Sequence, residues 1–440
     1  MISPSLRSVA RKSKDRYAGR MVSQQAAVRG LVFLVPMIIT GIISAQDTNS
    51  TDSDKQTIQL LVKRIDQLEA RLAQLESARS TTAGPTSEPA PVTPTLIAAS
   101  EPESAEERAE PERTDVSKTL LKIRGFGDVT FHGDTRKGDT TSFTLGQLDL
   151  FVTSDISEKF KFLSEIVFTA GQNNAFGVDV ERYLLQYSPN DYFNLSAGRF
   201  HTAIGYYNTA YHHSTWLQTA TGRPFLFQFD DSGGILPIHN IGLSATGLIP
   251  SRGLGLHYVA EIGNGRASLT PQANPVQNAV DENNGKAFNL GLFARPTAIR
   301  GLQAGISVYH DGRTPVGLPE ISETIVAAHA VLIRPSFEWL NEALLIRHAP
   351  SRSSQVFETP GFYTQVSRAF GAYRPYFRYQ YVNASDAEPL FPEVGLRHGP
   401  SVGLRYDPSE WVALKLQYDY TVFRHEASTN ALGLQIGFTF

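Results

Sequence analysis

Apolar and polar residues alternate most regularly in residues 431–440, the end of the 440-residue chain. A strand with lipid on one side and water on the other needs this pattern, and an edge strand of a soluble sandwich is the alternative. The opposite face carries small residues such as Gly433 and Gly437, which predict a thin wall beside water. The apolar face consists of Leu432, Leu434, Ile436, Phe438 and Phe440.

Strand-like patterns continue through residues 116–440, separated by connections of two kinds. Long connections such as 209–237 and 383–400 alternate with short ones such as 250–253 and 335–337. This alternation predicts an all-β fold, a transmembrane antiparallel β-barrel of about sixteen strands with loops at one rim and tight turns at the other. An even number of strands places both ends of the barrel at the turn side.

Charged residues within these strands fall opposite the apolar faces. An Arg or Lys that faces lipid near the bilayer midplane costs about 2–4 kcal/mol, so we expect these side chains to face a wet interior. For each of them, an ion pair that only stabilises the wall is the alternative. The predicted pore-lining residues are Lys122, Arg124, Asp128, Arg182, Arg199, His257, Arg374, Arg378, Arg405, Lys415 and Asp419.

Three segments are predicted before the barrel. Residues 1–45 pair basic residues with a short apolar stretch, the pattern of a secretory signal peptide, and an uncleaved anchor is the alternative. Met1 and Met21 are both possible starts of translation. Residues 80–115 are rich in Pro, Ala, Ser and Thr without an apolar period, which predicts a disordered linker.

Residues 46–79 have apolar positions at strict 3-4 spacing, typical of a short coiled coil. The sequence Arg-apolar-x-x-apolar-Glu occurs twice and resembles the trimerisation motif of short parallel coiled coils. A lone amphipathic helix is the alternative. Because fewer than three heptads are marginal alone, we expect another trimeric element to hold the chains together as well. The residues predicted to associate are Ile58, Leu61, Arg64, Ile65, Leu68, Glu69, Arg71, Leu72, Leu75 and Glu76.

Composition disfavours several function classes. With 40 Lys+Arg against 43 Asp+Glu, the chain shows no charge excess suited to nucleic acid. The absence of Cys excludes disulfides and thiolate metal sites. No Gly-x-Ser-x-Gly, His-Glu-x-x-His or phosphate-binding Gly loop occurs, so we expect neither an enzyme nor a cofactor or metal. A barrel enzyme with a metal or catalytic cluster of loop residues is the alternative, using His212, His213, Asp230, Asp231 and His239.

The closing strand, the connection pattern and the strand 197–201 before the longest loop together resemble the bacterial outer-membrane porins, most closely the phosphate-selective porin O and P group. The resemblance covers residues 116–440. It implies a homotrimer surrounded by outer-membrane lipid, placed there by the barrel-insertion machinery. It also implies passive diffusion of small hydrophilic solutes or ions, among which anions and phosphate are possible solutes. The near balance of charge departs from the Lys-rich and Arg-rich lumen of that group, so phosphate selectivity does not follow.

In sixteen-stranded porins the third long loop folds into the barrel and narrows it, and by the resemblance residues 209–237 take this place. A barrel that anchors the coiled coil as a periplasmic tether toward the cell wall is the alternative function. The predicted constriction residues are Tyr211, His212, His213, Trp216, Arg223, Asp230 and Asp231.

Overall fold

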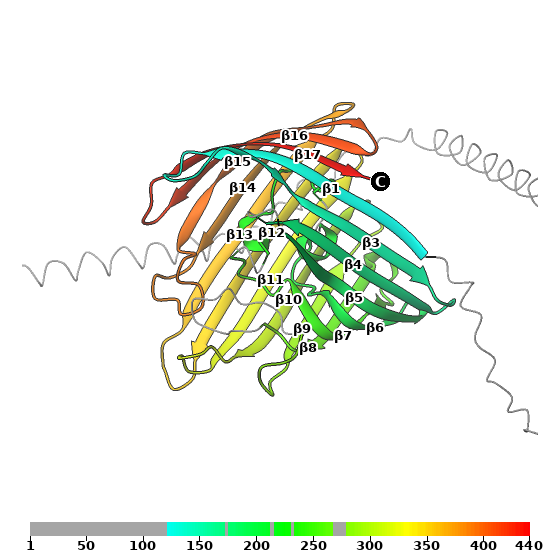
Figure 1. Ribbon diagram of the computed structural model, residues 1–440. Helices are drawn as coiled ribbons and strands as arrows, with labels where there is room; N and C mark the ends of the chain where they lie inside the picture. The colour runs from blue at the N-terminus through cyan, green and yellow to red at the C-terminus, as the bar shows by residue number, and fades with distance from the viewer. Residues whose placement is uncertain (1–120, 172–174, 212–214, 230–232, 267–278) are drawn as a thin grey trace, which may run out of the picture. The chain divides into compact units, whose positions relative to one another are not determined.

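The structure, a computed structural model, describes residues 121–440 except 172–174, 212–214, 230–232 and 267–278. The predicted signal peptide, coiled coil and linker lie outside the described residues. What is described consists almost entirely of β-strands that form the wall of a barrel (Figure 1). None of the described helices is long and apolar enough to cross a membrane.

The wall is one antiparallel sheet of 17 strand segments. β2 pairs with the second half of β1 and β3 with the first half, so β2 and β3 form one interrupted strand and the closed barrel has 16. The predicted all-β barrel is confirmed. The strands are β1 (Leu121–Asp134), β2 (Ser142–Leu145), β3 (Gln147–Asp155), β4 (Phe160–Ala170), β5 (Phe176–Asn190), β6 (Phe193–His201), β7 (His239–Ile249), β8 (Leu256–Gly263), β9 (Ala287–Ala294), β10 (Leu302–Arg313), β11 (Ile321–Arg334), β12 (Phe337–Pro350), β13 (Phe357–Arg368), β14 (Tyr373–Asn383), β15 (Leu396–Ser409), β16 (Val412–Phe423) and β17 (Thr429–Thr439).

The barrel closes where β1 and β17 lie side by side (Figure 1). Beyond the ladder, Gly125 and Phe440 exchange two backbone hydrogen bonds of 2.8 and 3.0 Å. A Cβ at Gly125 would lie 2.3 Å from the Phe440 ring, so a larger residue here would require this exposed side chain to move. The pattern of residues 431–440 is therefore that of a closing strand, as predicted.

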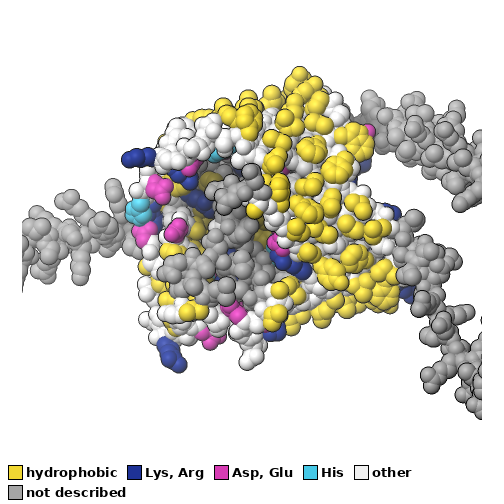
Figure 2. Space-filling view, in the orientation of Figure 1, with side chains coloured by type: hydrophobic (Ala, Val, Ile, Leu, Met, Phe, Trp, Pro, Cys, Tyr) yellow, Lys and Arg dark blue, Asp and Glu magenta, His cyan; other side chains and the backbone are white. Residues whose placement is uncertain are grey.

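The two faces of the wall differ in polarity. In β16, Lys415 and Gln417 on the inner face are each 2 % exposed, whereas Leu416 on the outer face is 44 % exposed. Apolar side chains cover the outer face of the strands at the front of Figure 2. This is the arrangement of a transmembrane barrel. Long and short connections alternate as predicted along most of the chain, but residues 295–301 and 314–320 form connections of equal length.

A hydrophobic core lies within the ring of strands. It joins the connection between β6 and β7, residues 202–238, to inward-facing residues of β9–β14. We call this connection the inner loop; it contains the one-turn helix α3 (Tyr207–Ala210) and the 3-10 turn η4 (Phe225–Phe227). Its green segments lie within the ring of strands in Figure 1. From the inner loop, the core takes Ile204, Tyr207, Leu226, Phe227, Ile235, Leu236 and Ile238.

Candidate functional site

The two ends of the inner loop are hydrogen-bonded to each other where the loop leaves and rejoins the wall. The N–H of Thr202 donates to the carbonyl of Ile238 at 3.0 Å. The side-chain amide of Asn208 spans the same two residues, donating to the Thr202 carbonyl at 2.7 Å and to the Ile238 carbonyl at 3.0 Å. Because Asn208 is buried, these bonds are shielded from water. These hydrogen bonds therefore fix the positions of the two ends of the loop.

Two glutamates of β12 hold the first part of the inner loop. The carboxylate of Glu342 accepts the N–H groups of Tyr206 at 2.5 Å and Tyr207 at 2.9 Å. Glu338 accepts the hydroxyl groups of Tyr211 and Thr219, each at 3.2 Å. Bonds of this kind to a carboxylate are stronger than those between neutral groups, so β12 anchors the loop.

The hydroxyl group of Tyr207 forms a hydrogen bond within the inner loop. Burial raises the pKa of Tyr207 to about 12, so the hydroxyl group stays protonated at neutral pH. It donates to the side-chain oxygen of Gln218 at 2.7 Å. The start of the loop is thereby joined to its middle.

Three predicted pore-lining cations bind the backbone of the inner loop. Arg378 donates to the carbonyls of Thr221 and Gly222. Arg405 donates to the carbonyls of Trp216 at 2.8 Å and Gln218 at 2.9 Å, and Lys415 donates to those of Thr215 and Ala220. These cations therefore lie between the wall and the loop, and they donate hydrogen bonds to its carbonyl oxygens.

The small residues of β17 lie beneath the same segment. A Cβ at Gly437 would lie 3.3 Å from the backbone of Trp216, and one at Gly433 would lie 3.7 Å from the Thr221 hydroxyl. The prediction that these glycines mark a wall beside water is wrong. The inner loop packs on both glycines, and at Gly437 it leaves little room for a Cβ.

Arg124 and Trp216 join β1 to the inner loop. The guanidinium of Arg124 lies 5.2 Å from the ring centroid of Phe126 and 5.3 Å from that of Trp216. Asp128, further along β1, is buried and accepts the hydroxyl group of Thr130 at 3.1 Å.

The remaining predicted residues of β1, β14 and β16 contact the wall. Lys122 forms an exposed ion pair with Asp155 at 2.9 Å on the turn side. Arg374 donates to the carbonyl of Pro335 at 2.9 Å, also near a tight turn. Asp419 accepts the side-chain amide of Gln417 at 2.9 Å.

Arg182 and Arg199 face an acidic cluster on the wall formed by β4–β7. Arg182 contacts Glu165 at 2.6 Å, and Arg199 lies 3.6 Å from Glu181. His239 pairs with Glu181 at 2.7 Å. Glu181 is the extra residue of a bulge in β5, which breaks the alternation that would have marked it, whereas Glu165 has the inward parity of β4, a signal that was available.

Of the predicted constriction residues, the structure describes Tyr211, Trp216 and Arg223. Arg223 donates to the carbonyl of Tyr211 at 3.1 Å, and its guanidinium lies 4.2 Å from the ring centroid of Phe229. It therefore contacts its own loop. His212, His213, Asp230 and Asp231 lie outside the described residues. No group of three or more described His, Asp or Glu residues is arranged to hold a metal ion.

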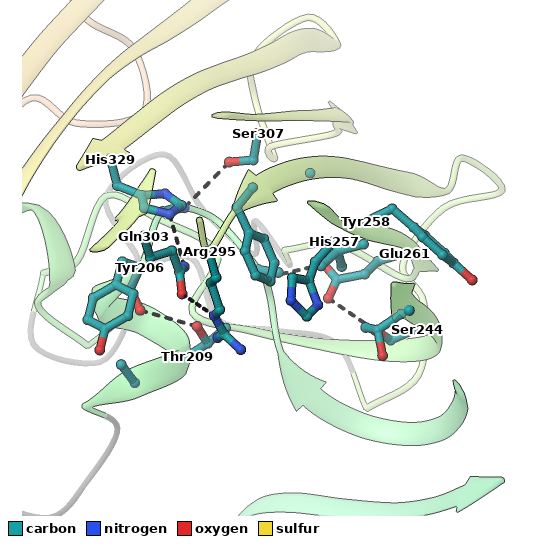
Figure 3. A pocket seen from close by; sticks show the side chains of 18 of the residues that line it. Tyr206, Thr209, Ser244, His257, Tyr258, Glu261, Arg295, Gln303, Ser307 and His329 are labelled. Carbon is teal, nitrogen blue, oxygen red and sulfur yellow. Dashed lines mark hydrogen bonds between the residues drawn. The ribbon is translucent and has the colours of Figure 1, made fainter. Parts of the chain in front are cut away.

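A cavity of about 660 Å³ lies between the start of the inner loop and the inner face of β7–β11 (Figure 3). His257 of β8 stacks on Phe293 with ring centroids 4.8 Å apart. Arg295, in the tight turn after β9, donates to Gln303 at 2.9 Å, and Gln303 in turn lies 3.0 Å from a ring nitrogen of His329. Since Arg295 belongs to a tight turn, the cavity extends to the turn-side rim.

The acidic residue deepest in this cavity is already satisfied. Glu261 accepts the N–H of Ala203 at 3.1 Å, the amide of Asn289 at 2.7 Å and the hydroxyl group of Ser244 at 3.3 Å. A second carboxylate, that of Asp191 in the turn between β5 and β6, also lines the cavity. Of the cationic and imidazole groups of the cavity, only His257 was predicted from the sequence. His329 has the inward parity of β11, a signal that was available, whereas Arg295 lies in a turn where alternation carries no information.

A buried network ties several connections together at the loop-side rim. Arg266 donates to the carbonyls of Gly234 at 2.9 Å and Ile235 at 2.8 Å in the inner loop. The two ring nitrogens of His348 lie 2.8 Å from Glu323 of β11 and 2.8 Å from Glu388 in the connection between β14 and β15. Carboxylates accept hydrogen bonds, so both ring nitrogens carry a proton in this arrangement. His348 thus joins the wall to a long connection as a cation.

Comparisons with known proteins identify solved structures with a similar fold. No protein-family model and no curated protein matches the sequence. The anion-selective porin of Comamonas acidovorans is 13% identical with a TM-score of 0.53, over 73% of this chain and 100% of that one. The barrel has the porin fold. At this level of identity the likeness shows the fold alone.

Two further porin-fold structures agree. OmpF of Salmonella typhi, solved in complex with daunomycin, is 11% identical with a TM-score of 0.51, over 73% of this chain and 97% of that one. The trimer form of OmpT of Vibrio cholerae is 9% identical with a TM-score of 0.50, over 73% of this chain and 99% of that one. The finer resemblance to the phosphate-selective O and P group stays a prediction.

Proposed function

We propose that this protein is an outer-membrane porin through which small hydrophilic solutes diffuse passively. The observation that carries the proposal is a cavity of about 660 Å³, lined by charged and polar as well as apolar groups, inside a closed barrel whose outer face is apolar. A barrel of this strand number is wide enough to hold water, and selectivity then arises at the narrowest point. The inner loop, bound to β12 and β14–β16, leaves the path on the side of β7–β11.

We further propose a preference for small anions, with phosphate as one possible solute. The cations beneath the inner loop bind its carbonyls and are covered by it, so solutes in the open part of the lumen do not contact them. The cavity presents Arg295, His257 and His329 together with the carboxylates of Asp191 and Glu261, and Glu261 accepts three hydrogen bonds. Arg295 is the one Arg or Lys among the described residues that line the cavity, and a guanidinium in a confined space attracts anions.

The ion preference can be tested by the reversal potential in a KCl gradient. We expect wild type to show a modest chloride preference and Arg295→Gln to lose it, because the substitution removes the permanent positive charge of the cavity. Arg352→Gln is the matched control, since Arg352 belongs to the connection between β12 and β13 and does not line the cavity. A cation preference in wild type would overturn the anion assignment.

We propose that the chain is a homotrimer in the outer membrane, with the coiled coil on the periplasmic side. β1 begins at Leu121 on the turn side, so the preceding segment joins the barrel at that rim. In the trimer, residues 46–79 would associate, and 80–115 would let them reach toward the cell wall. The closing strand that ends in Phe440 would serve as the signal for the barrel-insertion machinery.

Deletion of residues 47–115 separates the channel from the tether. We expect the conductance of each inserted barrel to be unchanged, because the described wall and inner loop contain none of these residues. Trimer yield, or co-sedimentation with cell walls, should fall. A variant that assembles and inserts normally yet conducts no ions would contradict this division of labour.

A further inference from the structure

An arc of arginines follows four consecutive tight turns of the barrel. Arg252 lies between β7 and β8, Arg300 between β9 and β10, Arg334 at the end of β11 and Arg368 at the end of β13. All four side chains are exposed. None of them forms an ion pair with a described carboxylate. The turn-side arc, as we call these residues, is therefore an exposed row of unneutralised positive charge.

Two members of the turn-side arc lie on the outer face of the wall. In β11, Ile325, Ala327 and Val331 face inward and are buried, so Arg334 falls on the opposite face. Arg334 also donates to the carbonyl of Arg300 at 3.3 Å, which holds two neighbouring turns together. Its charge therefore lies outside the lumen and does not contribute to the path for solutes.

Arg368 lies on the outer face for the same reason. Tyr363 and Gln365 of β13 face inward, and the guanidinium of Arg368 lies 5.5 Å from the ring centroid of Phe370. Phe370 and Tyr373 beside it are more than half exposed, at 58 % and 52 %. Aromatic rings and long basic side chains at the edge of an apolar belt are typical of the headgroup level of a membrane.

Elsewhere on the turn-side rim, some basic residues are paired with a carboxylate. At the turn between β3 and β4, Asp155 pairs with Lys122 at 2.9 Å and with Lys161 at 3.8 Å. These two lysines share one carboxylate, and Lys159 in the same turn forms no ion pair with a described carboxylate. On the described rim, the arc from β7 to β14 is the stretch where consecutive turns each carry an unpaired arginine.

The backbone conformation does not explain why residue 252 is an arginine. Its φ of 50° lies in the left-handed region, which disfavours a residue with a Cβ and suits glycine. The side chain makes no described hydrogen bond or ion pair that would offset this preference. Its position beside the other three arginines gives it a place in the same charged row.

We propose that the turn-side arc binds the phosphate groups of phospholipid headgroups in the leaflet that meets the turn side of the barrel. The proposal rests on the outer-membrane location proposed above. A guanidinium donates two parallel hydrogen bonds to a phosphate, and alternate strands of a sheet are about 10 Å apart, so each arginine can engage its own lipid. Phospholipid is favoured over free phosphate because Arg334 and Arg368 lie on the outer face, beside the apolar belt.

The test is the number of phospholipids that remain on the purified full-length protein, counted by native mass spectrometry after extraction from vesicles of phosphatidylethanolamine and phosphatidylglycerol. We expect Arg252→Gln/Arg300→Gln/Arg334→Gln/Arg368→Gln to retain several-fold fewer lipids than wild type. The matched control, Arg136→Gln/Lys137→Gln/Arg352→Gln, removes exposed charge from loop-side connections and should retain as many as wild type. Equal lipid retention by the turn-side variant and wild type would overturn the proposal.

Two further measurements distinguish a phospholipid site from a general anion site and test Arg252 on its own. Excess inorganic phosphate should leave the bound phospholipid in place, and its displacement by phosphate would show a general anion site and refute the lipid assignment. Arg252→Gly should make the folded protein more resistant to urea while lowering lipid retention; unchanged retention would remove Arg252 from the site. Lipid counts do not depend on conduction, so a folded barrel that retains lipid but passes no current would refute the channel alone.

Discussion

Replacing residues 206–236 with a short Gly-Ser turn should raise the single-channel conductance several-fold. The inner loop fills the lumen in front of β11–β16, where Glu342, Arg378, Arg405 and Lys415 bind its backbone. Its removal would let water reach these side chains and widen the path. The stem bond between Thr202 and Ile238 is kept, so the ends of β6 and β7 stay joined. Planar-bilayer recording in KCl measures the change.

The matched control for this variant is deletion of residues 136–140, an exposed part of the connection between β1 and β2. It shortens a connection without touching the inner loop, so its conductance should equal that of wild type. If deletion of the inner loop also left the conductance unchanged, the loop would not narrow the path, and the assignment of the constriction to it would be refuted.

His348→Ala should lower the free energy of unfolding by roughly 3–5 kcal/mol, because it leaves the buried carboxylates of Glu323 and Glu388 without their shared partner. All three side chains are fully buried, and each carboxylate lies 2.8 Å from a ring nitrogen of His348. Urea unfolding in detergent micelles, followed by tryptophan fluorescence, measures the loss.

The exposed pair Lys122–Asp155 provides the control for this loss. Its side chains are 65 % and 53 % exposed, so Asp155→Ala should cost less than about 1 kcal/mol. A similarly small effect of His348→Ala would show that the network at the loop-side rim does not hold the connections together. In that case the stability of the barrel would rest on the strand ladder alone.

The wall of the barrel could be predicted from the sequence because its signals are local. Alternation within 431–440 marks the closing strand, and Pro335 marks the tight turn between β11 and β12. Each strand of a lipid-facing wall must carry its own alternation, since lipid and water impose opposite demands on successive residues. The interruption between β2 and β3 was not foreseen, because it depends on both segments pairing with β1.

The interior could be predicted only in part. Alternation placed Lys415, Arg405 and Arg378 on the inner face, and all three contact groups inside the barrel. It could not show that their partners are carbonyls of the inner loop, because an irregular loop has no period that fixes its path. Glu342 escaped notice for the same reason, since an inward glutamate becomes an anchor only when the loop is in place.

The most direct test of the channel is a planar-bilayer recording of the folded, full-length protein. The structure predicts discrete upward current steps of uniform size as single barrels insert. Insertion verified by labelled protein in the bilayer, with no current steps at any applied voltage, would contradict the claim that the cavity beside the inner loop is part of an open path.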